Sequence, residues 1–444
     1  MTPGARIQAA IELVTEIGTG RGAADDVVGG YFRRHRFAGS KDRGAISEQI
    51  YAVLRRRAAI DWYLARVAPG EMPTPRRRVF AALLLVLEWR PEEIDRACDG
   101  DRFRPVPLDR YERDILQALA GKTIEHPDMP RAVRFNFPAW LEKTLGDVFG
   151  PRLGAEMAAM NGSAPLDLRV NHLKSNRADA RRSLADEGVS AVPTPFSPTG
   201  LRVYERIPLA TLEIFKAGAI EVQDEGSQLA ALMARVKPGM RVVDFCAGAG
   251  GKTLALAAEM RNKGHLVACD ISEARLQRSG QRLRRAGVSN VERRALTTER
   301  DKWVKHHAES FDRVFVDAPC TGTGTWRRNP DAKWRLTQQD LDELTALQAR
   351  ILESAARLVK PGGRLVYATC SLLPAENDAQ IEAFLASHAE FVLVPVGTVW
   401  QEAIGEPCPE PGAMLHLTPA RHGTDGFFVA VLERRAGTSA ADAA

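Results

Sequence analysis

Two cysteines follow short apolar segments, each where the sequence turns from apolar to polar. Cys320 stands in VFVDAPCTGTG (residues 314–324), and Cys370 stands in VYATCSLLPAEN (residues 366–377). A cysteine thiolate is a strong, soft nucleophile, and the free thiol has a pKa of about 8.5. Where two thiols share a site, one can add covalently to the substrate and the other can assist, as a base, the elimination that ends the reaction.

Methylation of a pyrimidine ring at C5 is a reaction that needs such a pair. That carbon is barely reactive until a thiolate adds to C6 and turns the ring into an enamine. The adduct must then lose the C5 proton and expel the thiolate. The alternative is structural, because a lone cysteine at the end of a strand is usually a small core residue.

The elements that must position these cysteines alternate between strand and helix in the C-terminal half. Four short apolar segments have the length of strands: RVVDFC (241–246), HLVACD (265–270), DRVFVD (312–317) and RLVYAT (364–369). Helical segments separate them. The alternation predicts an α/β domain with a parallel, doubly wound sheet.

One connection between two of these strands can be predicted in detail. Thr337 and Asp340 form a capping-box-like helix start, and Pro361-Gly362-Gly363 is expected to end the helix. The strands on either side are then neighbours in a right-handed unit, about 4.8 Å apart. Ligands of such sheets bind outside the carboxyl ends of the strands. We therefore expect Cys320 and Cys370 to open onto one pocket.

A glycine-rich loop, VVDFCAGAGGKT, follows the first of the strands and opens a helix. Gly248, Gly250 and Gly251 let a ligand approach the backbone, and the helix start offers free N–H groups. A Walker-type NTP loop is excluded, because Cys246 stands where that motif needs its first glycine. Asp270 ends the next strand, where an acid accepts ribose hydroxyls. The pattern fits NAD, FAD or S-adenosylmethionine equally, and a tight turn beside a surface acid is the alternative.

Three motifs together resemble the RNA cytosine-C5 methyltransferases of the NOL1/NOP2/Sun family: DFCAGAGGKT, DAPCTGTGTWRRNPDAKWR and YATCSLLPAEN. IFKAGAIEVQDEGSQLAA and DGFFVAVLER match the same family. SAPLDLRVNHLKSNR is similar to the RNA-contacting subdomain of the family, and the helical N-terminus resembles the NusB-like domain of its bacterial 16S rRNA enzyme. DNA cytosine methyltransferases are a poorer match, because their nucleophile is the cysteine of Pro-Cys and Thr-Cys-Ser is not expected in them.

The resemblance implies a domain order. An all-helical NusB-like RNA-binding domain (1–130) is followed by a small α+β RNA-contacting subdomain (131–218) and a Rossmann-like methyltransferase domain (219–435). Residues 436–444 are expected to form a disordered tail.

The resemblance also implies roles for single residues. Cys370 would add to C6 of cytosine, Cys320 would help release the methylated product, and Asp317 would contact the N3/N4 edge of the base. Asp317 and Asp270 would also lie beside S-adenosylmethionine, and Asp270 would bind its ribose. The loop that wraps this cofactor would be Cys246, Ala247, Gly248, Ala249, Gly250, Gly251 and Lys252.

Two positions depart from the family's pattern. The loop usually reads Cys-Ala-Ala-Pro-Gly-Gly-Lys, whereas Gly248 and Ala249 stand third and fourth here, which loosens the unfolded loop but keeps its backbone donors. The family's adenine-binding aspartate is missing near Ala295. We expect a backbone group, Thr297 or Thr298 to take its place.

Composition points to reduced thiols and an RNA partner. The six cysteines include no C-x-x-C pair, His306-His307 has no partner spacing, and no apolar run spans a bilayer. We therefore expect a cytoplasmic monomer without a metal or a membrane contact. Residues 31–66 carry nine Lys/Arg against three acids. This cluster suits RNA phosphates, and a solvated helix face is the alternative.

The predicted function is S-adenosylmethionine-dependent methylation of cytosine C5 in RNA, with 16S rRNA as the first candidate substrate. The target base must leave its stack to reach Cys370, which favours single-stranded sites. Trp326 and Trp334 stand among cations that can hold RNA, although Trp334 fits a core equally well. The same chemistry on tRNA or 23S rRNA, and a non-catalytic RNA-binding ribosome-assembly factor, are the alternatives.

Overall fold

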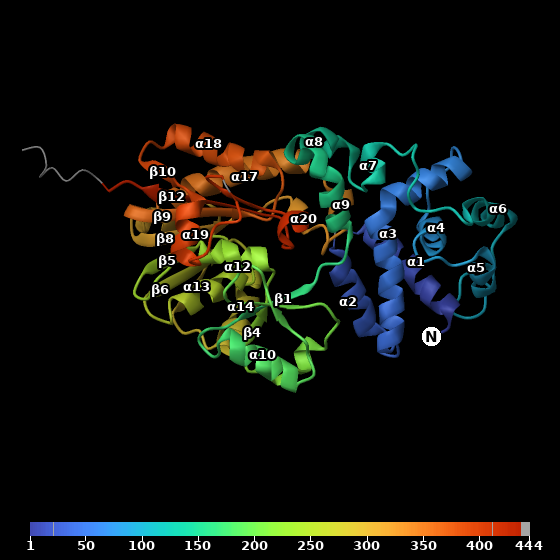
Figure 1. Cartoon of the computed structure of the whole chain (residues 1–444), viewed down its shortest axis with the longest axis horizontal. Coiled ribbons are helices and arrows are strands. Elements are labelled where there is room, and N and C mark those ends of the chain that lie inside the picture. Colours follow the sequence, from blue (N-terminus) through green and yellow to red (C-terminus); the bar gives the residue numbers. More distant parts are fainter. Residues whose placement is uncertain (21, 411, 437–444) are drawn as a thin grey trace, which may run out of the picture. The chain divides into compact units, whose positions relative to one another are not determined.

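The computed structural model describes residues 1–20, 22–410 and 412–436, and these form two compact units (Figure 1). The first unit contains residues 1–163 together with residues 325–336, called the insert below. The second contains residues 164–324 and the chain from residue 337 onward. Apart from Ala436, the expected tail lies outside the described residues.

The first unit contains helices and loops but no strand among its described residues. Its core contains Ile7, Leu13, Ile46 and Ile60, all fully buried. Its α-helices are α1 (Pro3–Thr19), α2 (Ala24–Arg34), α3 (Ser40–Val67), α4 (Pro75–Leu85), α5 (Pro91–Ala97), α6 (Arg110–Leu119), α7 (Arg131–Arg134), α8 (Glu142–Phe149), α9 (Leu153–Asn161) and α16 (Ala332–Arg335), with 3-10 turns η1 (Ala139–Leu141) and η2 (Gly150–Arg152). The unit thus extends beyond the helical domain expected over residues 1–130, and the division into three domains stays a prediction.

The insert packs inside the helical unit. Trp326 is buried, and Trp334 donates its indole N–H to the carbonyl of Leu54 at 2.7 Å. Lys333 is also buried and donates from Nζ to Oδ1 of Asn161 at 2.6 Å. The two tryptophans therefore contribute to packing within this unit, and the Trp326 ring is not available for base stacking.

The second unit begins with a small antiparallel sheet of order β2-β3-β1-β4. Strand β1 forms within SAPLDLRVNHLKSNR, the segment that resembles the RNA-contacting subdomain of the family. Leu168, Val170, Leu184 and Leu201 form part of its core. The elements are β1 (Leu166–Val170), α10 (Arg177–Asp186), β2 (Val192–Pro193), β3 (Gly200–Val203), η3 (Leu209–Thr211), α11 (Glu213–Lys216) and β4 (Ile220–Val222).

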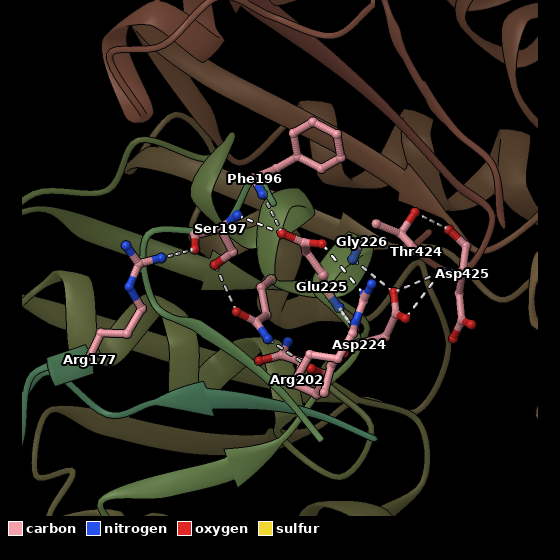
Figure 2. A network of polar contacts seen from close by, with 12 residues as sticks. Arg177, Phe196, Ser197, Arg202, Asp224, Glu225, Gly226, Thr424 and Asp425 are labelled. Atoms are coloured by element: carbon pink, nitrogen blue, oxygen red, sulfur yellow. Dashed lines mark hydrogen bonds and ion pairs between the residues drawn. The ribbon is translucent and has the colours of Figure 1, made fainter. Parts of the chain in front are cut away.

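Buried polar contacts join this small sheet to α12 (Glu225–Leu232), as Figure 2 shows. Arg202 donates to both carboxylate oxygens of Asp167, at 2.7 and 2.8 Å. Glu225 accepts the backbone N–H groups of Phe196 and Ser197, at 2.6 and 2.7 Å. Burial raises the pKa of Glu225, so its carboxylate depends on these donors.

The large sheet has eight strands within the described residues, and its main path runs β10-β12-β9-β8-β5-β6-β7, with β11 paired to β12. Strands β5 to β9 pair in parallel, whereas β10, β11 and β12 are antiparallel additions. All four predicted strands are present. The strands are β5 (Arg241–Asp244), β6 (His265–Asp270), β7 (Val291–Ala295), β8 (Phe311–Asp317), β9 (Val359–Thr369), β10 (Phe391–Val394), β11 (Leu415–Leu417) and β12 (Phe427–Arg434).

Helices cover both faces of this sheet, because alternate strand residues point to opposite sides. Val314 belongs to a buried cluster that includes residues of α15, α17 and α18, whereas its neighbour Phe315 belongs to the cluster that includes residues of α12, α13 and α19. None of the described helices is both long and apolar enough to cross a bilayer. The remaining elements are α13 (Gly251–Glu259), α14 (Glu273–Ala286), α15 (Lys302–His306), η4 (Thr323–Thr325), α17 (Gln338–Ala356), η5 (Pro374–Glu376), α18 (Asp378–Ser387), α19 (Val396–Ala403) and α20 (Pro419–His422).

The predicted crossover is present with one correction. Thr337 caps α17 and forms the capping box with Asp340, and β8 and β9 are parallel neighbours. The helix ends at Ala356, however, and Pro361-Gly362-Gly363 lies within β9. The expected helix end was wrong because this turn, with Gly362 at φ +75°, interrupts a strand that has already started pairing with β8.

Candidate active site

A cavity of about 610 Å³ opens at the carboxyl ends of β5, β6, β8 and β9. This is the edge at which parallel sheets bind ligands, and its volume is in the range of ligand pockets. The predicted site residues that line it are Cys246, Ala247, Gly248, Ala249, Gly251, Lys252, Asp270, Asp317, Cys320 and Cys370. Gly250 is the one predicted loop residue that does not line the cavity.

The two cysteines meet in this cavity. The Sγ atoms of Cys320 and Cys370 lie 3.4 Å apart, and both side chains are partly exposed. The hydrogen bond with Cys370 and the loss of solvent raise the pKa of the Cys320 thiol. Cys320 therefore keeps its proton, and the two sulfurs lie close enough to share a hydrogen bond in which either one can donate.

Lys252 and Asp317 form an ion pair beside the cysteines. The Lys252 Nζ atom donates to Asp317 Oδ2 at 2.6 Å and lies 5.2 Å from the centre of the Phe427 ring. Burial alone would lower the pKa of the Lys252 ammonium, but the charge and hydrogen bond of Asp317 raise it. The ammonium is therefore held charged against the carboxylate.

The glycine loop has the backbone that its sequence predicts. Gly250 is the N-cap of α13 at φ +81°, and a Cβ there would lie 2.9 Å from Cβ of Ser279. Gly248 has φ +54° and, like Gly251, has no atom within 4 Å of where its Cβ would be. Gly250 thus shapes the turn, while Gly248 and Gly251 leave open space for a ligand.

Asp270 closes the loop from the next strand. Its Oδ2 accepts the N–H of Gly248 at 2.8 Å, and its Oδ1 accepts the N–H of Ser272 at 2.7 Å. Each carboxylate oxygen can accept a second hydrogen bond. The open glycine cradle and this acid together fit a nucleoside with a free ribose diol.

The third cysteine of the cavity is not suited to nucleophilic attack. Burial raises the pKa of Cys246 well above its usual value, and the nearby carboxylates of Asp244, Asp317 and Asp270 raise it further. Cys246 therefore stays a thiol and acts as a wall of the cavity.

The cavity wall shows which residues lie near Ala295, where the family's adenine-binding aspartate is missing. Leu296 and Glu299 line the cavity, whereas Thr297 and Thr298 do not. Thr297 donates its hydroxyl to Asp301 at 2.8 Å instead. The sequence also missed Ile271 and Arg275, which line the cavity, and the buried Glu376 behind the cysteines. The hydroxyl residue after each cysteine was the one signal that pointed to Glu376.

The chain matches two family models: the 16S rRNA methyltransferase RsmB/F over residues 231–433, and the ferredoxin-like domain of RsmF/B-like methyltransferases over residues 137–210. It is 32% identical to the probable ribosomal RNA small subunit methyltransferase B of Synechocystis, over 88% of this chain and 91% of that protein. The chain belongs to the RsmB/F family of 16S rRNA methyltransferases. RsmB/F membership confirms the resemblance to the NOL1/NOP2/Sun family and S-adenosylmethionine as the cofactor.

A second relative and a solved structure also match most of the chain. The ribosomal RNA small subunit methyltransferase B of Xanthomonas campestris is 32% identical over 88% of this chain and 89% of that protein. The crystal structure of PH0851 superposes with a TM-score of 0.82 at 29% identity, covering 98% of this chain and 99% of that one. The α/β class with a Rossmann-like domain is confirmed, and the NusB-like character of the helical part stays a prediction.

Proposed function

We propose that this chain methylates C5 of a cytosine in 16S rRNA through a covalent adduct between Cys370 and C6. RsmB/F membership supports RNA methylation with S-adenosylmethionine. The observation that carries the cytosine-C5 assignment is the 3.4 Å separation of the Cys320 and Cys370 sulfurs inside the cavity that also holds the glycine loop. Covalent activation of a pyrimidine needs one sulfur to add and a second group to end the reaction.

The first step forms a bond between the Cys370 sulfur and C6. The thiolate supplies the electron pair, and the C5–C6 π electrons become available at C5. Asp317 accepts a hydrogen bond from the N4 amino group, and Lys252, paired with it at 2.6 Å, offsets the negative charge that the ring gains. When bound, S-adenosylmethionine supplies a methyl group that is electrophilic because it is carried on a sulfonium.

Release of the product requires a base at C5. The Cys320 thiol first loses its own proton to solvent, and its thiolate then removes the C5 proton. The electron pair of that C–H bond re-forms the C5–C6 double bond while the bond to Cys370 breaks and returns the Cys370 thiolate. The raised pKa of Cys320 makes its thiolate a stronger base, at the expense of its population at neutral pH.

The cofactor residues follow from the cavity wall. Gly248 and Gly251 offer backbone approach, and Asp270 would accept the ribose hydroxyls. Cys246, Ala247, Ala249 and Lys252 complete the loop around the nucleoside, with Gly250 fixing its turn. Glu299, the carboxylate on the wall beside Leu296, would take the adenine amino group in place of the missing aspartate.

RNA would be held outside the cavity by the helical unit and the ferredoxin-like segment. Within the basic cluster, Arg33, Arg34, Arg36 and Lys41 are exposed around α2 and α3, and Phe37 between them is 71% exposed. Cations around an exposed ring suit phosphates and a stacked base. We also propose that the helical domain is NusB-like and that the protein acts as a cytoplasmic monomer; its six free cysteines accord with a reducing compartment.

Methyl transfer to deproteinised RNA from a deletion strain tests this function, with tritiated cofactor as the probe. Bisulfite sequencing of the product and of RNA from the two strains then locates 5-methylcytosine. A single restored position in 16S rRNA is the expected result. Label in tRNA or 23S rRNA would change the substrate, label on another atom would end the cysteine mechanism, and no label on RNA or ribosomal particles would favour a non-catalytic assembly factor.

A further inference from the structure

Glu376 is a fully buried carboxylate behind the cysteine pair, and the mechanism above does not use it. Its Oε1 accepts the N–H of Thr321 at 2.8 Å and the side-chain amide of Gln348 at 2.9 Å. Its Oε2 accepts the hydroxyl of Thr321 at 2.5 Å and the hydroxyl of Ser371. Four donors thus converge on one carboxylate, which is the arrangement that lets a buried charge persist.

Three of the four donors come from the two cysteine loops, and the fourth, Gln348, comes from α17. Thr321 directly follows Cys320, and Ser371 directly follows Cys370. The two hydroxyls lie 3.3 Å apart and share the same carboxylate oxygen, while the sulfurs of the preceding residues lie 3.4 Å apart. The separation of the sulfurs is therefore tied to the separation of two hydroxyls that Glu376 holds.

The segment that carries Glu376 is itself anchored to the Cys370 strand. The Tyr367 hydroxyl donates to the carbonyl of Glu376 at 2.8 Å. Asn377 accepts the hydroxyl of Thr369 at 2.6 Å and donates to the carbonyl of Ser371 at 3.0 Å. The carboxylate thus has little freedom to follow a loop that moves, so it acts as a fixed point for both loops.

We propose that Glu376 is the positioning residue that sets the separation of the two reactive sulfurs, acting through the hydroxyls of Thr321 and Ser371. This inference rests on the proposed function, because it assigns the spacing of Cys320 and Cys370 to a group that touches neither the base nor the cofactor. The charge of Glu376 has a second effect. The pKa of the Cys320 thiol is raised most by the hydrogen bond with Cys370, then by burial and by the charge of Cys370. The charge of Glu376 raises it further by a smaller amount.

The primary test is Glu376→Gln, compared with Glu225→Gln as a matched loss of a fully buried carboxylate whose contacts lie away from the cysteine loops. We expect kcat for 5-methylcytosine formation to fall about 10²-fold in Glu376→Gln, the loss expected when reacting groups are misplaced by about 1 Å. The KM for RNA and the Kd for S-adenosylhomocysteine should stay unchanged. Glu225→Gln should keep wild-type kcat.

A pH profile separates positioning from mere stability. Without the charge of Glu376, the Cys320 thiol ionises at lower pH, so adduct release in Glu376→Gln should shift toward lower pH. A structural role alone would change the melting temperature and leave the position of this profile where it is.

A double-mutant cycle tests the route through the hydroxyls. Ser371→Ala and Thr321→Val should each lower kcat, and Glu376→Gln should add less on the Ser371→Ala background than on the wild type. Ser371→Thr, which keeps a hydroxyl, should retain more activity than Ser371→Ala. If Glu376→Gln does not fold, the two hydroxyl variants decide the question by the same readouts.

Two results would overturn the inference. One is a normal kcat and pH profile in Glu376→Gln, and the other is full additivity of Glu376→Gln with Ser371→Ala. Failure of the proposed function is a different outcome, because the wild-type protein itself would then form no 5-methylcytosine in the parallel assay.

Discussion

The Nζ atom of Lys252 lies 2.6 Å from Oδ2 of Asp317, although the two residues are 65 positions apart in the sequence. Lys252 stands in the first turn of α13, after β5, and Asp317 ends β8. A nearly buried ammonium in such a pair leaves an uncompensated charge when either partner is removed. The pair therefore links the cofactor loop to the residue that would contact the base.

Lys252→Met is expected to lower kcat about 10²-fold, with a smaller change in cofactor affinity. The reason is that Asp317 loses the cation that holds it and that offsets charge on the ring. Methyl-transfer kinetics and calorimetric titration with S-adenosylhomocysteine measure the two effects. If only cofactor affinity falls, Lys252 acts in cofactor binding as part of the glycine loop and not on the base.

Cys370→Ala should abolish both methylation and covalent RNA adducts while RNA affinity stays near the wild-type value, because only the nucleophile is removed. Filter binding and denaturing gels with labelled RNA make the comparison. Cys408→Ala is the control, since Cys408 is a partly exposed free thiol that does not line the cavity. Residual methylation by the Cys370→Ala variant would show that Cys370 is not the essential nucleophile.

Cys320→Ala should instead accumulate an adduct that survives denaturing gels. Addition at C6 and methyl transfer need only Cys370, whereas elimination loses its base. The gel-shifted fraction after a single turnover is the measurement. Normal turnover in this variant would assign release to another group.

Release of the adduct should accelerate with rising pH. The hydrogen bond with Cys370 raises the pKa of Cys320 only while Cys370 is free, but burial raises it in the adduct as well, so the Cys320 thiolate is scarce at pH 7 and increases about tenfold per pH unit below the pKa. Adduct formed at pH 7 and then shifted to higher pH isolates this step. Cys320→Ala should show no such pH dependence, and a wild-type release rate that falls with pH would contradict the assignment.

Asp270→Ala should raise the Kd for S-adenosylhomocysteine by about 10- to 100-fold, because a charge-assisted ribose contact and an anchor of the Gly248 N–H are lost together. Isothermal titration calorimetry gives the value. Glu273→Gln, an exposed acid at the start of α14, should bind like the wild type. Equal affinities in all three proteins would place the ribose elsewhere.

The central part of the fold could be predicted because its signals are local. The four apolar segments, the glycine turn and the Thr337–Asp340 capping box each depend on residues close in sequence, and each is present in the structure. Pro361-Gly362-Gly363 was misread for the same reason. A Pro-Gly turn after a helix resembles a helix end, and only pairing with β8 shows that the strand begins at Val359.

The rest of the site depends on residues far apart in sequence. Glu376 contacts Thr321, which is 55 positions away in the sequence, and the hydroxyl residue after each cysteine was the only local signal for that contact. A backbone group, Thr297 or Thr298 was expected to replace the missing aspartate, because these groups are near its position in the sequence. The fold instead presents Leu296 and Glu299 to the cavity.

The insert has a consequence for any attempt to divide this chain. A polypeptide starting at residue 164 would keep the tryptophans at 326 and 334 and the lysine at 333, but would lose Leu54 and Asn161, which they contact. The rings of these two tryptophans, which follow the Cys320 loop in the sequence, would then be exposed to water. Exposed apolar surface of this kind promotes self-association. Both halves should therefore be expressed as one uninterrupted gene product, since neither contains all the sequence it needs to complete its own interior.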